Sequence, residues 1–256
     1  MSSYEVVPLR AFNDNYIWTL RDARYAIVVD PGDAKPVIDY LTAEKLELAA
    51  IVVTHHHADH IGGVKALIAG RRIPVYGPHD PRIPDATQRL SEGESVTLPH
   101  FGVKLTVLEV PGHTRSHIAF YNDELLFCGD TLFAAGCGRL FEGTPTQMHD
   151  SLGKFMRLPD STRVYCAHEY TLSNIRFAKA VEPANRALLE WEARAQAQRQ
   201  KDLPTLPSTI GLERAANPFV RCTEPDLIDS ASRHAGKPLS DPVSVLAAIR
   251  EWKNNF

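Results

Sequence analysis

The sequence lacks an excess of basic residues: its 256 residues carry 28 Lys and Arg against 31 Asp and Glu, a net charge of −3. Proteins that bind phosphate backbones or anionic lipids rely on surplus positive charge, so nucleic acid and membrane partners are disfavoured. No stretch approaches the roughly 18 apolar residues of a membrane span, and a charge and a proline interrupt the N-terminal residues before a signal-peptide core could form. We therefore expect a cytoplasmic protein.

Paired cysteines are also lacking. The chain has four cysteines: Cys128, Cys137, Cys166 and Cys222. They lie far apart and form no C-x-x-C pair, so the sequence indicates neither a zinc ribbon nor a redox dithiol. A chain of this length buries roughly 70–75% of its unfolded surface and does not need disulfide bonds for stability. We expect free thiols in a reducing compartment, with Cys128 and Cys166 packed in the core.

The first two thirds of the sequence predict a mixed α/β region. Clusters of β-branched and aromatic residues between positions 4 and 30 predict an antiparallel meander that ends in a turn at Asp30-Pro31-Gly32. A helix is expected over 36–45, a strand buried on both faces over 48–54, and a helix over 61–69. Further strands are expected at 73–76, 103–110, 117–121 and 125–128.

After His168 the pattern becomes helical, with apolar residues at helical spacing over 184–201. Pro183 and the Asp241-Pro242 pair are helix-start signals, and residues 201–207 are a linker candidate. We therefore predict an α+β domain over 1–170 and a small, mostly helical domain over 171–256.

Four of the 11 histidines lie within residues 55–60, in the segment Thr54-His55-His56-His57-Ala58-Asp59-His60, which has the form HxHxDH. This segment follows the predicted buried strand, where sites of α/β proteins usually form. Alternation in an extended segment places His55 and His57 on one side, and a tight turn can bring Asp59 and His60 to the same cavity. Imidazole and carboxylate are ligands that zinc and similar ions prefer.

Three later residues offer further ligands, each just beyond an apolar run: His113, Asp130 and His168. One His or Asp at a strand end is usually a cap or a satisfied polar group. Their combination with the HxHxDH segment instead predicts a site for two metal ions. His56 is expected to pack beside the ligands, and the sequence does not decide the role of His117. Surface positions are expected for the remaining histidines: His79, His100, His149 and His234.

These motifs resemble the metallo-β-lactamase superfamily, and more narrowly the glyoxalase II (hydroxyacylglutathione hydrolase) family, nearly from end to end. The stretches that carry the narrower resemblance are 13–16 (NDNY), 136–143 (GCGRLFEG), 168–174 (HEYTLSN) and 217–221 (NPFVR). The resemblance implies an αββα sandwich followed by a helical domain that binds substrate. It also implies a monomeric thiolester hydrolase (EC 3.1.2.6) that cleaves S-D-lactoylglutathione to D-lactate and glutathione in methylglyoxal detoxification.

The resemblance also assigns site residues. It places His55, His57 and His113 on one metal, Asp59, His60 and His168 on a second, and Asp130 between the two, with a bridging hydroxide as the nucleophile. Asp59 and Asp130 are the implied catalytic residues. The ions are most simply zinc, with iron or manganese as alternatives because the same ligands suit all three. For the glutathione part of the substrate it implies a set of binding residues: Arg139, Phe141, Tyr170, Asn174, Arg250 and Lys253.

Two positions depart from the family pattern. Ser116 stands where the family commonly has glycine, and Phe141 stands where some members have tyrosine, so only the ring contact carries over. A lactonase and a persulfide dioxygenase-like oxidoreductase are the alternative functions. A lactonase would share the metals but not the helical tail. A persulfide dioxygenase binds one metal ion, so it would not need both Asp59 and His60 as ligands.

Overall fold

The computed structural model describes residues 4–256. The chain divides into two compact units that do not follow chain order. The first comprises the residues up to Glu109 together with Ser116–Gly129, and the second comprises Val110–Arg115 together with Asp130–Phe256. The boundary predicted at residue 170 remains a prediction.

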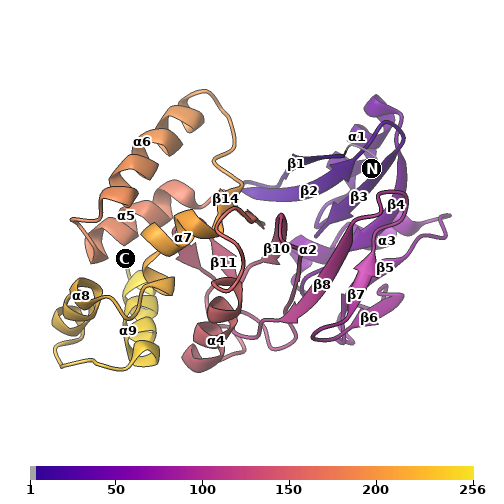
Figure 1. The fold of residues 1–256 in the computed structure, drawn as a ribbon. Coiled ribbons are helices and arrows are strands. Elements are labelled where there is room, and N and C mark those ends of the chain that lie inside the picture. Colours follow the sequence, from indigo (N-terminus) through magenta and orange to yellow (C-terminus); the bar gives the residue numbers. More distant parts are fainter. Residues whose placement is uncertain (1–3) are drawn as a thin grey trace. The chain divides into compact units, whose positions relative to one another are not determined.

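A six-stranded mixed sheet forms the larger part of the first unit (Figure 1, indigo to magenta). The order of its strands across the sheet is their order along the chain: β1 Glu5–Ala11, β2 Asn15–Arg21, β3 Tyr25–Val29, β4 Glu47–Val52, β5 Val75–Pro78 and β6 Gln88–Leu90. The predicted meander is confirmed, since β1, β2 and β3 pair antiparallel. Strands β3 to β6 then pair parallel, which places the carboxyl ends of β3 and β4 at the same edge.

Helix α1 (Ala34–Glu44) makes the crossover between β3 and β4, and its Val37 and Leu41 are buried against the sheet with the apolar side chains of α3 (Val64–Ile68). The predicted helix over 61–69 is wrong in its bounds. A short helix α2 (Ala58–Ile61) already contains Asp59 and His60, and Gly62-Gly63 separates it from α3. Backbone atoms of residues 31–34 lie so close to these glycines that no side chain fits there.

In the rest of the first unit, each strand pairs antiparallel with the next one along the chain: β7 Ser95–Thr97, β8 Lys104–Glu109, β9 Ile118–Tyr121 and β10 Leu125–Gly129. Three of the four later strand predictions, over 103–110, 117–121 and 125–128, agree with these elements within one residue at each end. The fourth, over 73–76, is shifted by two residues relative to β5. The backbone N–H of Ile118 donates to Thr54 O at 3.0 Å, which ties the start of β9 to the segment that follows β4.

The second unit is mostly helical, and its C-terminal helices are drawn in orange and yellow in Figure 1. It contains short strands and helices: β11 Leu132–Phe133, β12 Gly136–Cys137, α4 Pro145–Phe155, β13 Arg163–Cys166, α5 Thr171–Val181, α6 Arg186–Gln200, β14 Ser208–Thr209, α7 Ile210–Ala216, η1 Pro218–Val220, α8 Pro225–Ala235 and α9 Pro242–Asn254. Phe177 of α5 packs on Phe219 and Trp252, with ring centroids 6.0 and 5.6 Å apart, and so joins α5, η1 and α9 in one core.

Capping residues set the helix starts in this unit. Asp241 caps α9 and Pro242 takes its first position, as predicted. The start predicted at Pro183 is wrong, because the Asn185 side chain accepts from Ala187 N and Leu188 N and α6 begins at Arg186. Residues 201–207 form the predicted non-helical connection between α6 and β14.

Candidate active site

The histidine segment of the first unit begins just after β4. His55 and His60 are fully buried, and His57 is half-buried. His55 Nε2 lies 3.1 Å from His57 Nδ1, so the two rings present nitrogens to one point, as the alternation predicts. Asp59 Oδ2 lies 3.4 Å from His60 Nε2, and Asn15 Nδ2 donates to the same oxygen at 3.0 Å. The His55 and His60 ring centroids lie 4.1 Å apart, so the four predicted ligands of this unit form one cluster.

Asp30 anchors this cluster, and sequence reasoning missed it. Its carboxylate accepts from Thr54 N and Thr54 Oγ1 at 2.7 Å each, and it lies 3.0 Å from His60 Nδ1. A carboxylate on Nδ1 fixes the tautomer of a histidine and leaves Nε2 for a ligand. The position of Asp30 at the carboxyl end of a strand, like that of the histidine segment, was the available signal.

Two further histidines lie beside the cluster. His117 stacks on His55 with ring centroids 4.5 Å apart, so it packs against a predicted ligand. His56 Nδ1 lies 3.6 Å from Asp80 Oδ2, a buried carboxylate whose pKa is held far below its usual range, chiefly by the Arg82 guanidinium. Ser116 donates a short hydrogen bond to the same carboxylate, so the departure from glycine adds a polar contact.

In the second unit, Asp130 stands between two histidines. Its Oδ2 lies 3.4 Å from His113 Nε2, and its Oδ1 lies 3.4 Å from His168 Nε2. All three side chains are buried. His113 Nδ1 lies 2.9 Å from Arg139 O, a contact in which Nδ1–H donates and Nε2 keeps its lone pair. Asp130 therefore directs one carboxylate oxygen toward each of two predicted metal ligands.

A cavity of about 410 Å³ lies within the second unit. His113 and Asp130 line it together with all six predicted substrate-binding residues: Arg139, Phe141, Tyr170, Asn174, Arg250 and Lys253. Three of these are cations, Phe141 is an exposed ring at 63%, and Tyr170 stacks on His168 at 4.8 Å. The cavity therefore combines two predicted metal ligands with a positively charged lining.

Arg250 is buried and Lys253 is half-buried, to an extent that the sequence alone does not indicate. Cations one turn apart near a helix C-terminus ordinarily form a solvated face, but Arg250 is only 4% exposed and its Nη1 donates to Cys137 O at 2.7 Å. Its buried Nε has no hydrogen-bond acceptor among residues 4–256. Lys253 donates to Asn174 Oδ1, and burial, helped by the neighbouring Arg250, lowers the pKa of Lys253 to about 7.

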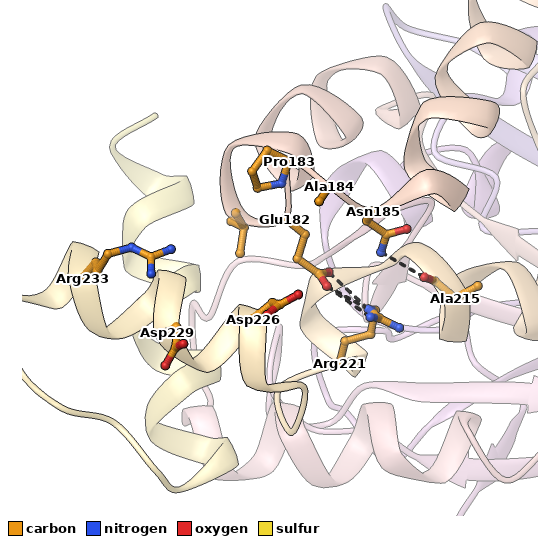
Figure 2. A pocket seen from close by; sticks show the side chains of 10 residues that line it. Glu182, Pro183, Ala184, Asn185, Ala215, Arg221, Asp226, Asp229 and Arg233 are labelled. Carbon is orange, nitrogen blue, oxygen red and sulfur yellow. Dashed lines mark hydrogen bonds and ion pairs between the residues drawn. The ribbon is translucent and has the colours of Figure 1, made fainter.

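A second hollow in this unit, shown in Figure 2, lies beside the end of α5 and is lined by charged residues. The Glu182 carboxylate accepts from Arg221 Nε at 3.2 Å and Nη2 at 3.1 Å, as the dashed lines mark. Glu182 is buried, so this pair is a structural ion pair in the wall of the hollow.

The remaining predictions concern cysteines, histidines and membrane spans. All four cysteines are buried and form no disulfide bond within residues 4–256, and burial raises the pKa of the Cys137, Cys166 and Cys222 thiols. His79, His100 and His234 are exposed as predicted, and His149 is half-buried. Within residues 4–256, no helix combines the length and apolarity that crossing a bilayer requires.

Two family models match the chain in succession. Residues 12–168 match the metallo-beta-lactamase superfamily, and residues 169–256 match the hydroxyacylglutathione hydrolase C-terminus. Curated hydroxyacylglutathione hydrolases are also 51–55% identical to the chain over 98% of its length. The chain belongs to the hydroxyacylglutathione hydrolase family. The family, the fold with its helical C-terminal region, and the enzyme class predicted from the sequence are thereby confirmed.

Similar proteins agree with this assignment. The hydroxyacylglutathione hydrolase of Nitrosomonas europaea is 55% identical, over 98% of this chain and 96% of its own length. That of Cupriavidus taiwanensis is 53% identical, over 98% of this chain and 99% of its own. A solved structure of the BLEG-1 B3 metallo-beta-lactamase is 27% identical with a TM-score of 0.62, covering 86% of this chain and all of that one. The structure of ETHE1 from Myxococcus xanthus, at 24% identity, TM-score 0.63 and 98% of each chain, shows the shared fold alone.

As in other proteins with this fold, the chain carries His and Asp clusters that are typical of a binuclear metal site. Hydroxyacylglutathione hydrolases act on glutathione thioesters. The charged cavity of the second unit is lined by two of the predicted metal ligands. The individual site residues remain predictions.

Proposed function

We propose that the chain hydrolyses S-D-lactoylglutathione to D-lactate and glutathione, as a monomer in the cytoplasm. The single observation that carries the proposal is the cavity of the second unit, which is lined by His113 and Asp130 and by the basic residues Arg250 and Lys253. The glutathione part of the substrate is an anionic tripeptide that such a lining would bind. The free cysteines suit a reducing compartment, where glutathione is abundant.

The proposed metal ligands are those that the resemblance implies: His55, His57 and His113 for one ion, Asp59, His60 and His168 for the other, and Asp130 for both. The donor chemistry fits, because imidazole nitrogens and carboxylate oxygens suit zinc, iron and manganese. Zinc is our first choice. The hydrogen bonds on the Nδ1 atoms of His60 and His113 also support ligation through Nε2. When bound, such ions make water a nucleophile at neutral pH and polarise a carbonyl oxygen.

The side chains of the chain then divide the remaining work. Asp59 and Asp130 are the proposed catalytic residues: Asn15 orients Asp59, and the contacts of Asp130 with His113 and His168 orient its two oxygens. The glutathione thiol has a free pKa near 8.5, so it departs as a thiolate with little help from a general acid. No cysteine or serine nucleophile is needed.

Binding of the tripeptide is the proposed role of the helical part, residues 171–256, together with the segment around Arg139. Arg250 offers a buried Nε whose hydrogen bond a substrate carboxylate would complete. Leaving such a donor unpaired costs about 1–3 kcal/mol, so a carboxylate that fills the position gains in affinity. Phe141 supplies a ring at the exposed side of the cavity.

The proposal is tested by comparing substrates at equal concentration: S-D-lactoylglutathione, the same acyl group on a small thiol, a lactone and a β-lactam. We expect kcat/KM to be highest for the glutathione thioester, by at least about a hundredfold over the small thioester, because the tripeptide supplies binding energy. Equal rates for the two thioesters, or a preference for the lactone, would contradict the proposed substrate.

A further inference from the structure

We propose that Glu213 of α7 and Asn217, the residue that follows α7, are positioning residues that hold the hairpin 132–137 in the shape that forms one wall of the substrate cavity. The hairpin consists of β11, β12 and the two-residue turn Ala134-Ala135. Phe133 and Cys137 from its two strands line the cavity. The kinetic part of this inference rests on the proposed function, whereas its structural part does not.

The hairpin has little internal support. Its ladder has only two residue pairs, Leu132 with Cys137 and Phe133 with Gly136, and a two-stranded ribbon is at best marginally stable even when longer. Ala135 has φ +54°, a left-handed conformation that is unfavourable for alanine and usual for glycine. A residue in this region persists when its surroundings determine its conformation, and such residues gather at ligand sites.

The side chains of Glu213 and Asn217 fix the conformation of the turn. Glu213 Oε2 accepts from Ala135 N at 3.1 Å, the N–H of the left-handed residue itself. Asn217 Nδ2 donates to Phe133 O at 3.2 Å and to Gly136 O at 2.9 Å, on both sides of the turn. Asn217 Nδ2 also lies 2.9 Å from Glu213 Oε2, so the two residues form one unit.

The proposed substrate residues complete the same frame. Asn174 Nδ2 donates to Ala134 O at 2.9 Å, and Arg250 Nη1 donates to Cys137 O at 2.7 Å. A displaced hairpin would therefore also release Asn174 and Arg250 from their present orientations. This links Glu213, which does not line the cavity, to the binding of the tripeptide.

Glu213 itself is fully buried, and Ser208 Oγ donates a short hydrogen bond to its other oxygen, Oε1. Burial raises the pKa of Glu213 to about 7, against the effect of its three donors. A buried carboxylate is a costly way to fill space, so its use here points to the acceptor that it offers to Ala135 and Asn217. Glutamine can offer the same acceptor at Oε2 while its amide donates to Ser208, whereas methionine fills the volume and offers none.

The test compares Glu213→Gln with Glu213→Met, using the metal-loaded full chain. For Glu213→Met we expect amide hydrogen exchange in 132–137 to accelerate at least about tenfold, with α6 unchanged. We expect KM for lactoylglutathione to rise at least about tenfold, with less than about a threefold change in kcat/KM for the small thioester. Glu213→Gln is expected to restore both readouts to within about threefold of the natural protein.

Glu182→Met is the matched control, because it removes another buried carboxylate of the same unit, paired with Arg221 rather than with the hairpin (Figure 2). Glu182→Met should lower the midpoint of thermal unfolding. It should leave amide hydrogen exchange in 132–137 and the KM for lactoylglutathione unchanged. The inference is overturned if Glu213→Met leaves hairpin exchange unchanged, if Glu182→Met produces the same changes, or if Glu213→Gln behaves like Glu213→Met.

Two further outcomes are distinguishable. If Glu213→Met does not fold, Ser208→Ala, which removes only the donor to Oε1, should shift both readouts in the same direction by a smaller amount, and no shift overturns the inference. If the natural protein does not hydrolyse lactoylglutathione, the proposed function fails. Hairpin exchange then still decides whether Glu213 holds the turn.

Discussion

Lys253 should take up a proton when the glutathione part of a ligand binds. Burial and the neighbouring Arg250 lower the pKa of Lys253 to about 7 in the free protein. At pH 8, about one lysine in eleven would then be protonated. A bound carboxylate favours the charged form and moves the pKa back toward 10.5, so binding at pH 8 should take up close to one proton, about 0.9 per chain.

The same shift sets how affinity depends on pH. Below pH 7 the lysine is already charged and binding carries no protonation cost. Above pH 7 each further pH unit should weaken the binding of a glutathione ligand about tenfold, until the usual lysine pKa is approached. The KM of the thioester should rise in the same way, provided that it reports binding.

Isothermal titration calorimetry with a non-hydrolysable S-alkyl glutathione, in two buffers that differ in ionisation enthalpy, measures the proton uptake directly. Lys253→Met is the control: it should bind more weakly at pH 7 and show less uptake, and the difference between the two proteins gives the share of Lys253. Equal uptake by both proteins at pH 8 would refute the assignment of the titrating group.

Three further predictions concern other parts of the site. Asp130→Ala should lose metal and nearly all turnover, whereas His56→Ala should keep both; normal metal content in Asp130→Ala would disprove the bridging role. Arg250→Ala combined with Lys253→Ala should raise KM for lactoylglutathione about tenfold or more while kcat and the small thioester are little affected; an unaltered KM would contradict this. Because the raised pKa of Glu213 makes the folded state bind the proton more tightly, unfolding free energy should fall by about 1–3 kcal/mol as pH rises from about 4.5 to about 7. Glu213→Gln should remove that pH dependence in urea unfolding.

Strong local patterns explain what the sequence predicted well. The apolar run before Thr54 is a buried strand. The polar residues after it cluster because only a few residues separate the end of this strand from a short helix. The cap at Asp241 acts within one turn of its own helix, so the sequence there determines the structure. In such cases the physical cause lies within a few residues.

Other features depend on residues far apart in the chain. The hairpin 132–137 has no strand signal of its own and is held by side chains some 40 to 113 residues away. Glu213 has the appearance of an ordinary polar helix residue in the sequence, and only the fold buries it. The boundary of α6 was misplaced because Pro183 is a stronger general signal than Asn185, whose capping bonds appear only in the structure.

Metal content measured on active protein tests the central claim most directly. We expect about two divalent ions per chain in protein that hydrolyses S-D-lactoylglutathione, loss of activity when a chelator removes them, and recovery when they are restored. Full activity with one ion per chain, or activity that survives complete removal of metal, would contradict the proposed site.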